Sequence, residues 1–271
     1  MKKRRKTIII AEIGENHLGD IKLAKKMIEE AASAGVDIVK FQSYLASEVS
    51  ENDPEKEWFK KVQLSDEAHY ELKEYAEKHG VEFLSSAFSI NRAKLLLEKL
   101  RLKKIKIASS EMLNFPLLDY VNEHAETVFL STGMATIEEI EAALKHLNKV
   151  KNCYIMHCVT QYPTRPEDVN LHVITTLKTV FPRYHVGYSD HTIGIKAVVL
   201  AVALGAEVVE KHFTLDKTLQ GTDHILSADP EELKKMVKEI EEVETLLGSY
   251  VKKPTEGEEK IKSLVRSRFP K

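Results

Sequence analysis

The chain has 271 residues, 43% of them hydrophobic, and a formal net charge of −2. This length and apolar content suit one large α/β domain or two small ones. The weak net charge excludes a global basic field for nucleic acid. The first apolar run contains Glu12, is too short to span a membrane and lacks the cleavage site of a signal peptide. The two cysteines, Cys153 and Cys158, lie five residues apart on one predicted strand, so their side chains point to opposite faces and no disulfide is expected between them. Reduced thiols and a cytoplasmic setting fit best, and no zinc-type cysteine spacing is present.

Apolar, β-rich runs alternate with amphipathic helical runs along the whole chain. Short runs rich in β-branched residues, bounded by turn residues, are typical of buried strands. The eight predicted strands cover residues 7–13, 37–42, 82–88, 104–109, 127–132, 153–158, 185–190 and 207–213.

Helical patterns lie between these strands, with capping residues at their ends. The first begins after Gly19 and ends at Gly35, and the second begins at Ser65 and ends at Gly80. A last long helix has Pro230 in its first turn. The clearest helical patterns cover residues 20–35, 65–80, 136–149 and 229–248.

Strands that alternate with helices predict parallel pairing, and eight such repeats predict a closed (β/α)₈ TIM barrel, an α/β fold. An open doubly wound sheet is the alternative, but no glycine-rich phosphate loop follows the first strand. We assign residues 1–250 to the barrel domain. Residues 251–271 are polar and charged, and we expect a linker there.

Polar or ionisable residues stand at the end of every predicted strand. Strands that are buried on both faces and purely structural would stay apolar. In a barrel the carboxyl ends of the strands build the active site, so the sequence predicts a polar cavity there. The strand-end residues are Glu12; Lys40 and Gln42; Ser85 and Ser86; Lys106, Ser109 and Glu111; Ser131 and Thr132; His157 and Thr160; Ser189, Asp190 and His191; and Glu210, Lys211 and His212.

The residue types at these ends suggest two kinds of chemistry. His191 and His212 end neighbouring strands and could share a divalent metal, with Asp190 or Glu210 orienting the rings or completing the shell. The two lysines, together with several serines, would suit a phosphate. The same lysines could instead form internal ion pairs, or one of them a Schiff base.

The motifs in chain order resemble the N-acetylneuraminate (sialic acid) synthases, a family that includes legionaminic and pseudaminic acid synthases and spore-coat polysaccharide relatives. The resemblance extends from about residue 8 to about residue 268. It rests on "IIAEIGENHLGD", "AGVDIVKFQSY", "KIASSEMLNFPLL", "LSTGMATIEEI", "HCVTQYPTRPEDVNL", "VGYSDHTIG", "ALGAEVVEKHFTLDK" and "GTDHILSADPEEL".

The resemblance implies a reaction between phosphoenolpyruvate and the open-chain aldehyde of an N-acetylated hexosamine, such as N-acetylmannosamine. The products would be a nine-carbon 2-keto sugar acid and phosphate, which leaves by C–O cleavage. The implied cofactor is Mn²⁺, with Mg²⁺ or Co²⁺ as alternatives, held by His191 and His212.

The resemblance also implies roles for single residues. Glu12, Lys40, His191 and His212 match catalytic positions. Asp223 matches an aspartate that binds hydroxyls of the acceptor sugar. The remaining matches are to substrate contacts: Gln42, Ser86, Lys106, Ser109, Ser131, Tyr162 and Ser189.

The sequence departs from the family pattern in four places. Two of them are Thr160, where an asparagine is usual, and the "GTDHILS" loop, which replaces a more usual proline-containing version. Ser86 and Ala87 stand where a threonine and a proline are usual, although the hydroxyl is kept. The family also carries an antifreeze-like C-terminal domain, which closes over the partner subunit's acceptor pocket, and no such sequence follows residue 268. A truncation, a separate lid protein and an acceptor that needs no lid all remain open.

Two other functions remain open alongside the synthase. One is a barrel aldolase or lyase that works through a Schiff base on Lys40 or Lys106. The other is a non-catalytic barrel that needs a partner to supply the lid. The expected partners are the two small-molecule substrates, with no nucleic acid or membrane, and a homodimer is compatible with the family.

Overall fold

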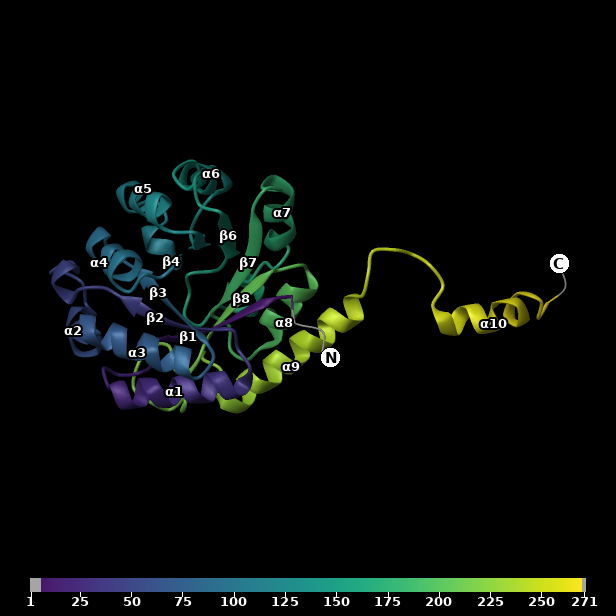
Figure 1. Ribbon diagram of the computed structural model, residues 1–271, viewed down its shortest axis with the longest axis horizontal. Helices are drawn as coiled ribbons and strands as arrows, with labels where there is room; N and C mark the ends of the chain where they lie inside the picture. The colour runs from purple at the N-terminus through teal and green to yellow at the C-terminus, as the bar shows by residue number, and fades with distance from the viewer. Residues whose placement is uncertain (1–5, 270–271) are drawn as a thin grey trace.

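Eight parallel strands close into a barrel in the computed structural model, which describes residues 6–269 (Figure 1). Each strand pairs with the next along the chain, and β8 pairs with β1 in the register Glu12 to His212. The TIM barrel prediction is therefore confirmed. The strands are β1 (Ile8–Gly14), β2 (Ile38–Ser43), β3 (Glu82–Ala87), β4 (Lys104–Ile107), β5 (Thr127–Ser131), β6 (Asn152–His157), β7 (His185–Asp190) and β8 (Val208–His212).

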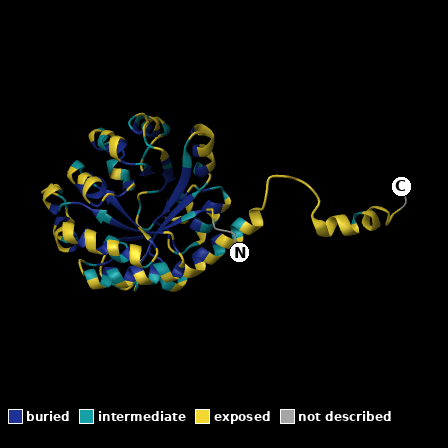
Figure 2. Cartoon of the chain, in the orientation of Figure 1, coloured by how far each residue is buried: buried dark blue, intermediate teal, exposed yellow. Residues whose placement is uncertain are grey.

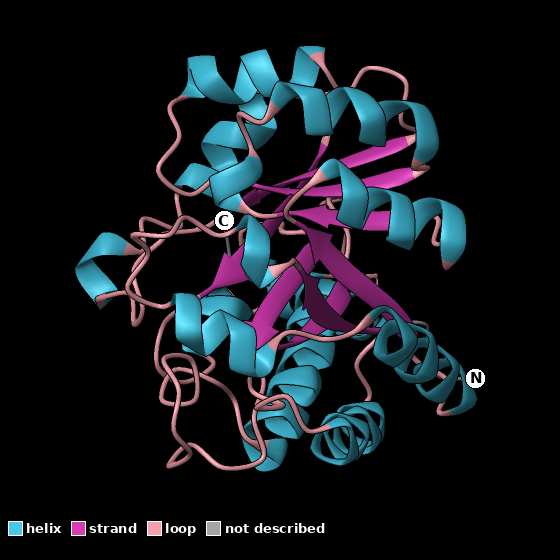
Figure 3. Cartoon of the chain, turned by 90° about the vertical axis from the view of Figure 1, so that its left-hand side faces the viewer, coloured by secondary structure: helices cyan, strands magenta, loops and turns pink. Residues whose placement is uncertain are grey.

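Helices surround the barrel and cover its outer face (Figure 3). Their inward faces are buried and their outward faces are exposed, as Figure 2 shows. A π-helical segment, η2, extends α4, and short 3₁₀ turns lie in the loops. The helices around the barrel are α1 (Ile21–Ala34), α2 (Lys56–Val62), α3 (Asp66–Lys78), α4 (Ile90–Lys94), η2 (Leu95–Lys99), α5 (Phe115–His124), α6 (Ile137–Lys145), α7 (Val173–Val180), α8 (Lys196–Ala203) and α9 (Pro230–Leu247), and the 3₁₀ turns are η1 (Ala46–Glu48), η3 (Ser109–Glu111) and η4 (Pro166–Asp168).

Side-chain caps define where several of these helices begin. The Asp20 carboxylate accepts from the backbone N–H groups of residues 22 and 23 at the start of α1. Thr136 and Asp229 each form a reciprocal capping box with the glutamate three positions later. Gly35 ends α1 with a φ of 90°, a left-handed conformation that glycine adopts without strain. These local interactions explain why the sequence pattern predicted these helices closely.

A small apolar cluster fills the barrel interior beneath the carboxyl ends of the strands. Gly187 makes room for it, because a Cβ there would lie 2.4 Å from Cγ1 of Val208. A larger cluster lies between the strands and the surrounding helices. The interior cluster consists of Ile10, Ile38, Leu84, Phe129, Met156 and Val208.

The observed strands begin and end within two residues of the predicted bounds. The C-terminal segment differs from prediction, because residues 256–266 form helix α10 (Glu256–Arg266) instead of a plain linker. Thr255 caps this helix in a capping box with Glu258, a signal that was present in the sequence. Figure 1 shows α10 projecting away from the barrel. Among the described residues, no helix has the length and apolar character needed to cross a membrane.

Candidate active site

A cavity of about 600 Å³ opens at the carboxyl ends of the strands. The substrate-contact and catalytic residues expected from the sequence all line this cavity, although they come from positions spread over the whole chain. Its lining includes Glu12, Lys40, Gln42, Ser86, Lys106, Ser109, Ser131, Tyr162, Ser189, His191, His212 and Asp223.

The two-residue period of a strand places these polar groups directly above the apolar interior cluster. Ile10 belongs to that cluster, and Glu12 follows two positions later on the same side of β1. Val208 and Glu210 have the same relation on β8. β1 and β8 therefore each supply one apolar residue to the interior cluster and one polar residue to the cavity.

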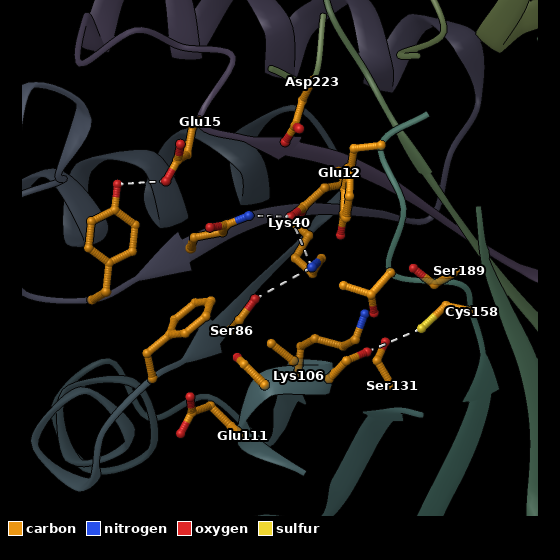
Figure 4. Close-up of a pocket in the computed structure, with 18 of the residues that line it drawn as sticks. Glu12, Glu15, Lys40, Ser86, Lys106, Glu111, Ser131, Cys158, Ser189 and Asp223 are labelled. Carbon is orange, nitrogen blue, oxygen red and sulfur yellow. Dashed lines mark hydrogen bonds and ion pairs between the residues drawn. The ribbon is translucent and has the colours of Figure 1, made fainter. Parts of the chain in front are cut away.

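Two lysines and two glutamates, Lys40, Lys106, Glu12 and Glu210, form the cavity floor. Figure 4 labels the first three of them. The Nζ atom of Lys40 lies 3.0 Å from Oε1 of Glu12 and 3.3 Å from Oε1 of Glu210. Lys106 donates to both Glu210 oxygens, at 2.7 and 2.8 Å. Ser189 donates to Glu210 at 3.0 Å. Glu210 therefore lies between the two lysines, and it does not orient a histidine ring as the sequence pattern had suggested.

The four floor groups have displaced pKa values because they are buried and close together. Burial raises the pKa of Glu12 to about 7, although Lys40 opposes the shift. Burial also acts to raise the pKa of Glu210, but Lys106 and Lys40 outweigh it and hold that pKa far below its usual value. Glu12 is thus the floor carboxyl that can exchange a proton near neutral pH.

The two histidines lie beside each other at the ends of β7 and β8. Their ring centroids are 5.4 Å apart, and Tyr162 stacks on His191 at 4.1 Å. Nδ1 of His191 lies 2.7 Å from the carbonyl oxygen of Val159. Burial lowers the pKa of His191 to about 4 and that of His212 to about 3. Both rings are therefore uncharged at neutral pH, the form that can bind a metal.

The residues around these rings fit a divalent ion only in part. Nδ1 of His212 is buried without a hydrogen-bond partner, and the Asp223 carboxylate lies 3.4 Å away. An uncharged imidazole nitrogen without a partner is a suitable ligand. Within residues 6–269, however, no three histidine, cysteine or acidic side chains are grouped to hold an ion. Two histidines are thus the protein ligands that this site offers.

Hydroxyl groups surround the lysines on the other side of the floor. Lys40 donates to Ser86 at 3.4 Å, and Ser109 contacts the Cys158 sulfur at 3.2 Å. The backbone N–H of Gly133 donates to Ser109. A Cβ at Gly133 would lie 2.1 Å from Oγ1 of Thr160, so only glycine lets these groups approach. Cations and hydroxyl donors together make this region suitable for a phosphate or a carboxylate.

Asp190 does not belong to the site, contrary to the role we considered for it from the sequence. Its carboxylate lies 2.6 Å from Nζ of Lys211, and both side chains are fully buried outside the cavity lining. Tyr188 and Thr192 donate to the same carboxylate. Asp190 and Lys211 alternate with Ser189 and Glu210, so they point to the helix side of the sheet.

Sequence analysis missed Glu15 as a cavity residue. Its carboxylate accepts from the Tyr44 hydroxyl at 2.9 Å and from Nε1 of Trp58 at 2.7 Å. Glu15 lies in the loop after β1, beyond the strand end on which the sequence argument relied. Only its position three residues after Glu12 could have drawn attention to it.

Comparisons with known proteins agree with the motifs. A model of the NeuB family matches residues 27–252. The chain is 42% identical to N,N'-diacetyllegionaminic acid synthase of Campylobacter jejuni, covering 97% of this chain and 84% of that one. It is 38% identical to human N-acetylneuraminate-9-phosphate synthase, covering 90% of this chain and 72% of the human one.

A solved structure shares the whole barrel. The crystal structure of N-acetylneuraminic acid (sialic acid) synthetase from Leptospira borgpetersenii, in complex with citrate, superimposes with a TM-score of 0.92 at 37% identity. The match covers 97% of this chain and 92% of that one. By its family model, its relatives and its structure, this chain belongs to the NeuB family of synthases.

Proposed function

We propose that this enzyme condenses phosphoenolpyruvate with the open-chain aldehyde of an N-acetylated hexosamine, giving a nine-carbon 2-keto sugar acid and phosphate. The observation that carries the proposal is the single cavity in which two buried lysines, Glu12 and two uncharged histidines meet. Membership in a family whose named relatives are sugar-acid synthases supports it.

Phosphoenolpyruvate would bind on the cavity floor. Lys106 and Lys40 offer positive charge. Hydroxyl groups come from Ser86 on β3, Ser109 in the turn η3 after β4, and Ser131 on β5. The phosphate and carboxylate of phosphoenolpyruvate need such donors because both are anionic. Gln42 donates to Glu12 at 3.3 Å and holds that carboxyl beside the reacting centre.

The reaction forms one carbon–carbon bond, and at C2 a new carbon–oxygen bond to water replaces the carbon–oxygen bond to phosphate. The C3 carbon of phosphoenolpyruvate attacks the aldehyde carbon, and the aldehyde oxygen takes up a proton. Water then adds at C2, and the C2–O bond to phosphate breaks. Glu12 would exchange the proton, because its pKa of about 7 lets it hold or release one near neutral pH.

His191 and His212 would hold a divalent ion, for which Mn²⁺ is the first candidate and Mg²⁺ or Co²⁺ are alternatives. Such an ion supplies Lewis-acid polarisation of a bound oxygen. The uncharged rings and the unpartnered Nδ1 atom of His212 support this assignment. Stacking by Tyr162 fixes the His191 ring in place.

Asp223 would bind the acceptor sugar through its hydroxyls. It lines the cavity next to His212, and its position fits an acceptor that lies between the histidines and the cavity mouth. The human relative is named for a phosphorylated product and the Campylobacter relative is not. Family membership therefore leaves open whether the acceptor is phosphorylated.

The test is phosphate release from phosphoenolpyruvate by the purified chain, with Mn²⁺ and a panel of N-acetylhexosamines. Release should require an acceptor and the metal, and it should disappear in EDTA and in the Lys40→Met variant. Pyruvate trapped on Lys40 or Lys106 by borohydride, together with activity in EDTA, would instead establish the Schiff-base alternative. A chain that binds neither phosphoenolpyruvate nor Mn²⁺ would refute the proposal.

A further inference from the structure

The cavity divides into a floor with paired charges and an outer part that is acidic. The cations in its lining are Lys40 and Lys106, and both are paired with floor glutamates. The outer carboxylates face no lysine or arginine in an ion pair anywhere in residues 6–269. They are Glu15, Glu48, Glu55, Glu111 and Asp223.

The cavity is a ligand site on grounds independent of these acidic groups. Glu12 and His212 line it and are almost completely buried, and each keeps one side-chain atom without a hydrogen-bond partner. Buried polar atoms are nearly always satisfied, so such orphans indicate groups that a ligand completes.

Glu15 is the outer carboxylate that the protein holds most firmly. The Tyr44 hydroxyl donates to Oε1 and the Trp58 indole N–H donates to Oε2. Trp58 comes from α2 and Tyr44 directly follows β2, so two separate segments fix the Glu15 carboxylate. Figure 4 labels Glu15 at the cavity. Burial raises the pKa of Glu15 to about 7, although both hydrogen bonds oppose the shift.

We propose that Glu15 makes the acceptor half of this cavity select an uncharged sugar, bound through hydroxyl and amide N–H donors, over a sugar phosphate. The inference rests on the proposed synthase function and names the acceptor class for it. Carboxylates accept hydrogen bonds from hydroxyl and N–H groups but repel a phosphate dianion. Specificity commonly depends on such a repulsive element as much as on attraction.

The surroundings offer little to offset that repulsion. A phosphate-binding acceptor site would be expected to present arginine or lysine to the phosphate. The described cavity lining contains no arginine, and its two lysines serve the floor. Asp223 and Glu55 add to the negative field at Glu15.

The test compares matched pairs of substrates, each N-acetylhexosamine with its own 6-phosphate, at pH 8, where Glu15 is ionised. The wild type should have the higher kcat/KM for every uncharged sugar that reacts. Glu15→Gln should reduce the preference by about tenfold, because the charge is lost. The amide oxygen can accept from the Trp58 N–H while the amide nitrogen donates to the Tyr44 hydroxyl, so both contacts are kept. Glu74→Gln, an exposed change on α3 outside the cavity, makes the same change in net charge and should leave the preference unchanged.

Calorimetric binding of the same pairs, in the presence of phosphoenolpyruvate, provides a readout that needs no turnover. Tighter binding of the uncharged member, with the difference reduced in Glu15→Gln, supports the proposal even if the synthase reaction fails. A wild type that binds or uses the phosphorylated member better overturns it. So does an undiminished preference in Glu15→Gln.

Discussion

Two buried lysine–carboxylate pairs each use a residue of β8 and serve different purposes. Lys106 and Glu210 meet at 2.7 Å on the cavity side, and Lys211 and Asp190 meet at 2.6 Å on the helix side. The second pair is enclosed, and Asp190 also accepts from Tyr188 and Thr192. The first borders a 600 Å³ cavity. Burial of an ion pair alone therefore does not distinguish a structural pair from a functional one.

The two ion pairs differ in their surroundings, because only the first lies beside an open cavity. Around Lys106 and Glu210, neighbouring groups keep unsatisfied atoms and displaced pKa values, as Glu12 and His212 do. Around Lys211 and Asp190, the local backbone and hydroxyl groups complete the network. The comparison predicts that changes on the cavity side affect catalysis and that changes on the helix side affect stability.

The largest effect should come from His212→Ala. Because the ring is a proposed metal ligand in the cavity, acceptor-dependent phosphate release should fall about 10³-fold. The melting temperature should change little. His185→Ala, at the amino end of the neighbouring strand β7 and outside the cavity lining, is the matched control and should keep full activity. Equal losses of phosphate release in the two variants would show that the carboxyl ends of the strands are no more important for catalysis than their amino ends.

Lys211→Met should instead make the protein less stable. It leaves the Asp190 charge buried without its cation, so the free energy of unfolding should fall by about 3–5 kcal/mol. Denaturant titration measures this change. The double variant with Asp190→Asn should recover part of the loss. A single variant as stable as the wild type would show that the enclosed pair is not structural.

Lys106→Met should weaken phosphoenolpyruvate binding while the barrel stays folded. Loss of a hydrogen bond to a charged group costs about 1.5–3 kcal/mol, which corresponds to roughly a 10- to 100-fold rise in Kd. Calorimetry with phosphoenolpyruvate measures the change. Lys104→Met, on the same strand but paired with Glu82 away from the cavity, should bind normally. Similar Kd values for the two variants would show that phosphoenolpyruvate does not bind at the cavity floor.

The smallest effect should be the contribution of Glu15 to the pH dependence of the protein's stability. Burial holds the pKa of the folded state at about 7, above its usual value of 4.5, so ionisation costs stability as pH rises from about 4.5 to 7. Glu15→Gln lacks this cost. Its unfolding free energy relative to wild type should therefore rise by about 1–2 kcal/mol between pH 5 and pH 8, allowing for partial solvent exposure. A difference that is flat with pH would mean that Glu15 is not desolvated.

Local patterns were enough to predict the barrel and the cavity residues that stand at its strand ends. The β-rich runs gave the strands to within two residues, because buried parallel strands need continuous apolar segments. Strand ends then located Glu12, Lys40 and His212, since the carboxyl ends of barrel strands share one face. Motifs outside the strands, read through the family resemblance, added Tyr162 and Asp223.

Contacts between distant loops could not be predicted in this way. The bond from Trp58 to Glu15 joins positions 43 residues apart. It depends on how α2 lies over the cavity, which no local pattern specifies. The sequence argument likewise treated Asp190 and Glu210 alike as carboxylates at strand ends, and the structure assigned them to opposite sides of the sheet.

By itself, the sequence determined the order and type of the elements, the closed parallel barrel and the polar character of its carboxyl end. Hydrophobic period, helix caps and turn residues act over short distances, so they are visible in the chain. The tertiary structure decided the partner of each charge: Glu210 between two lysines, Asp190 with Lys211, and Glu15 held by Tyr44 and Trp58. Those pairings depend on strand register and loop packing, and only the folded chain brings such distant residues together.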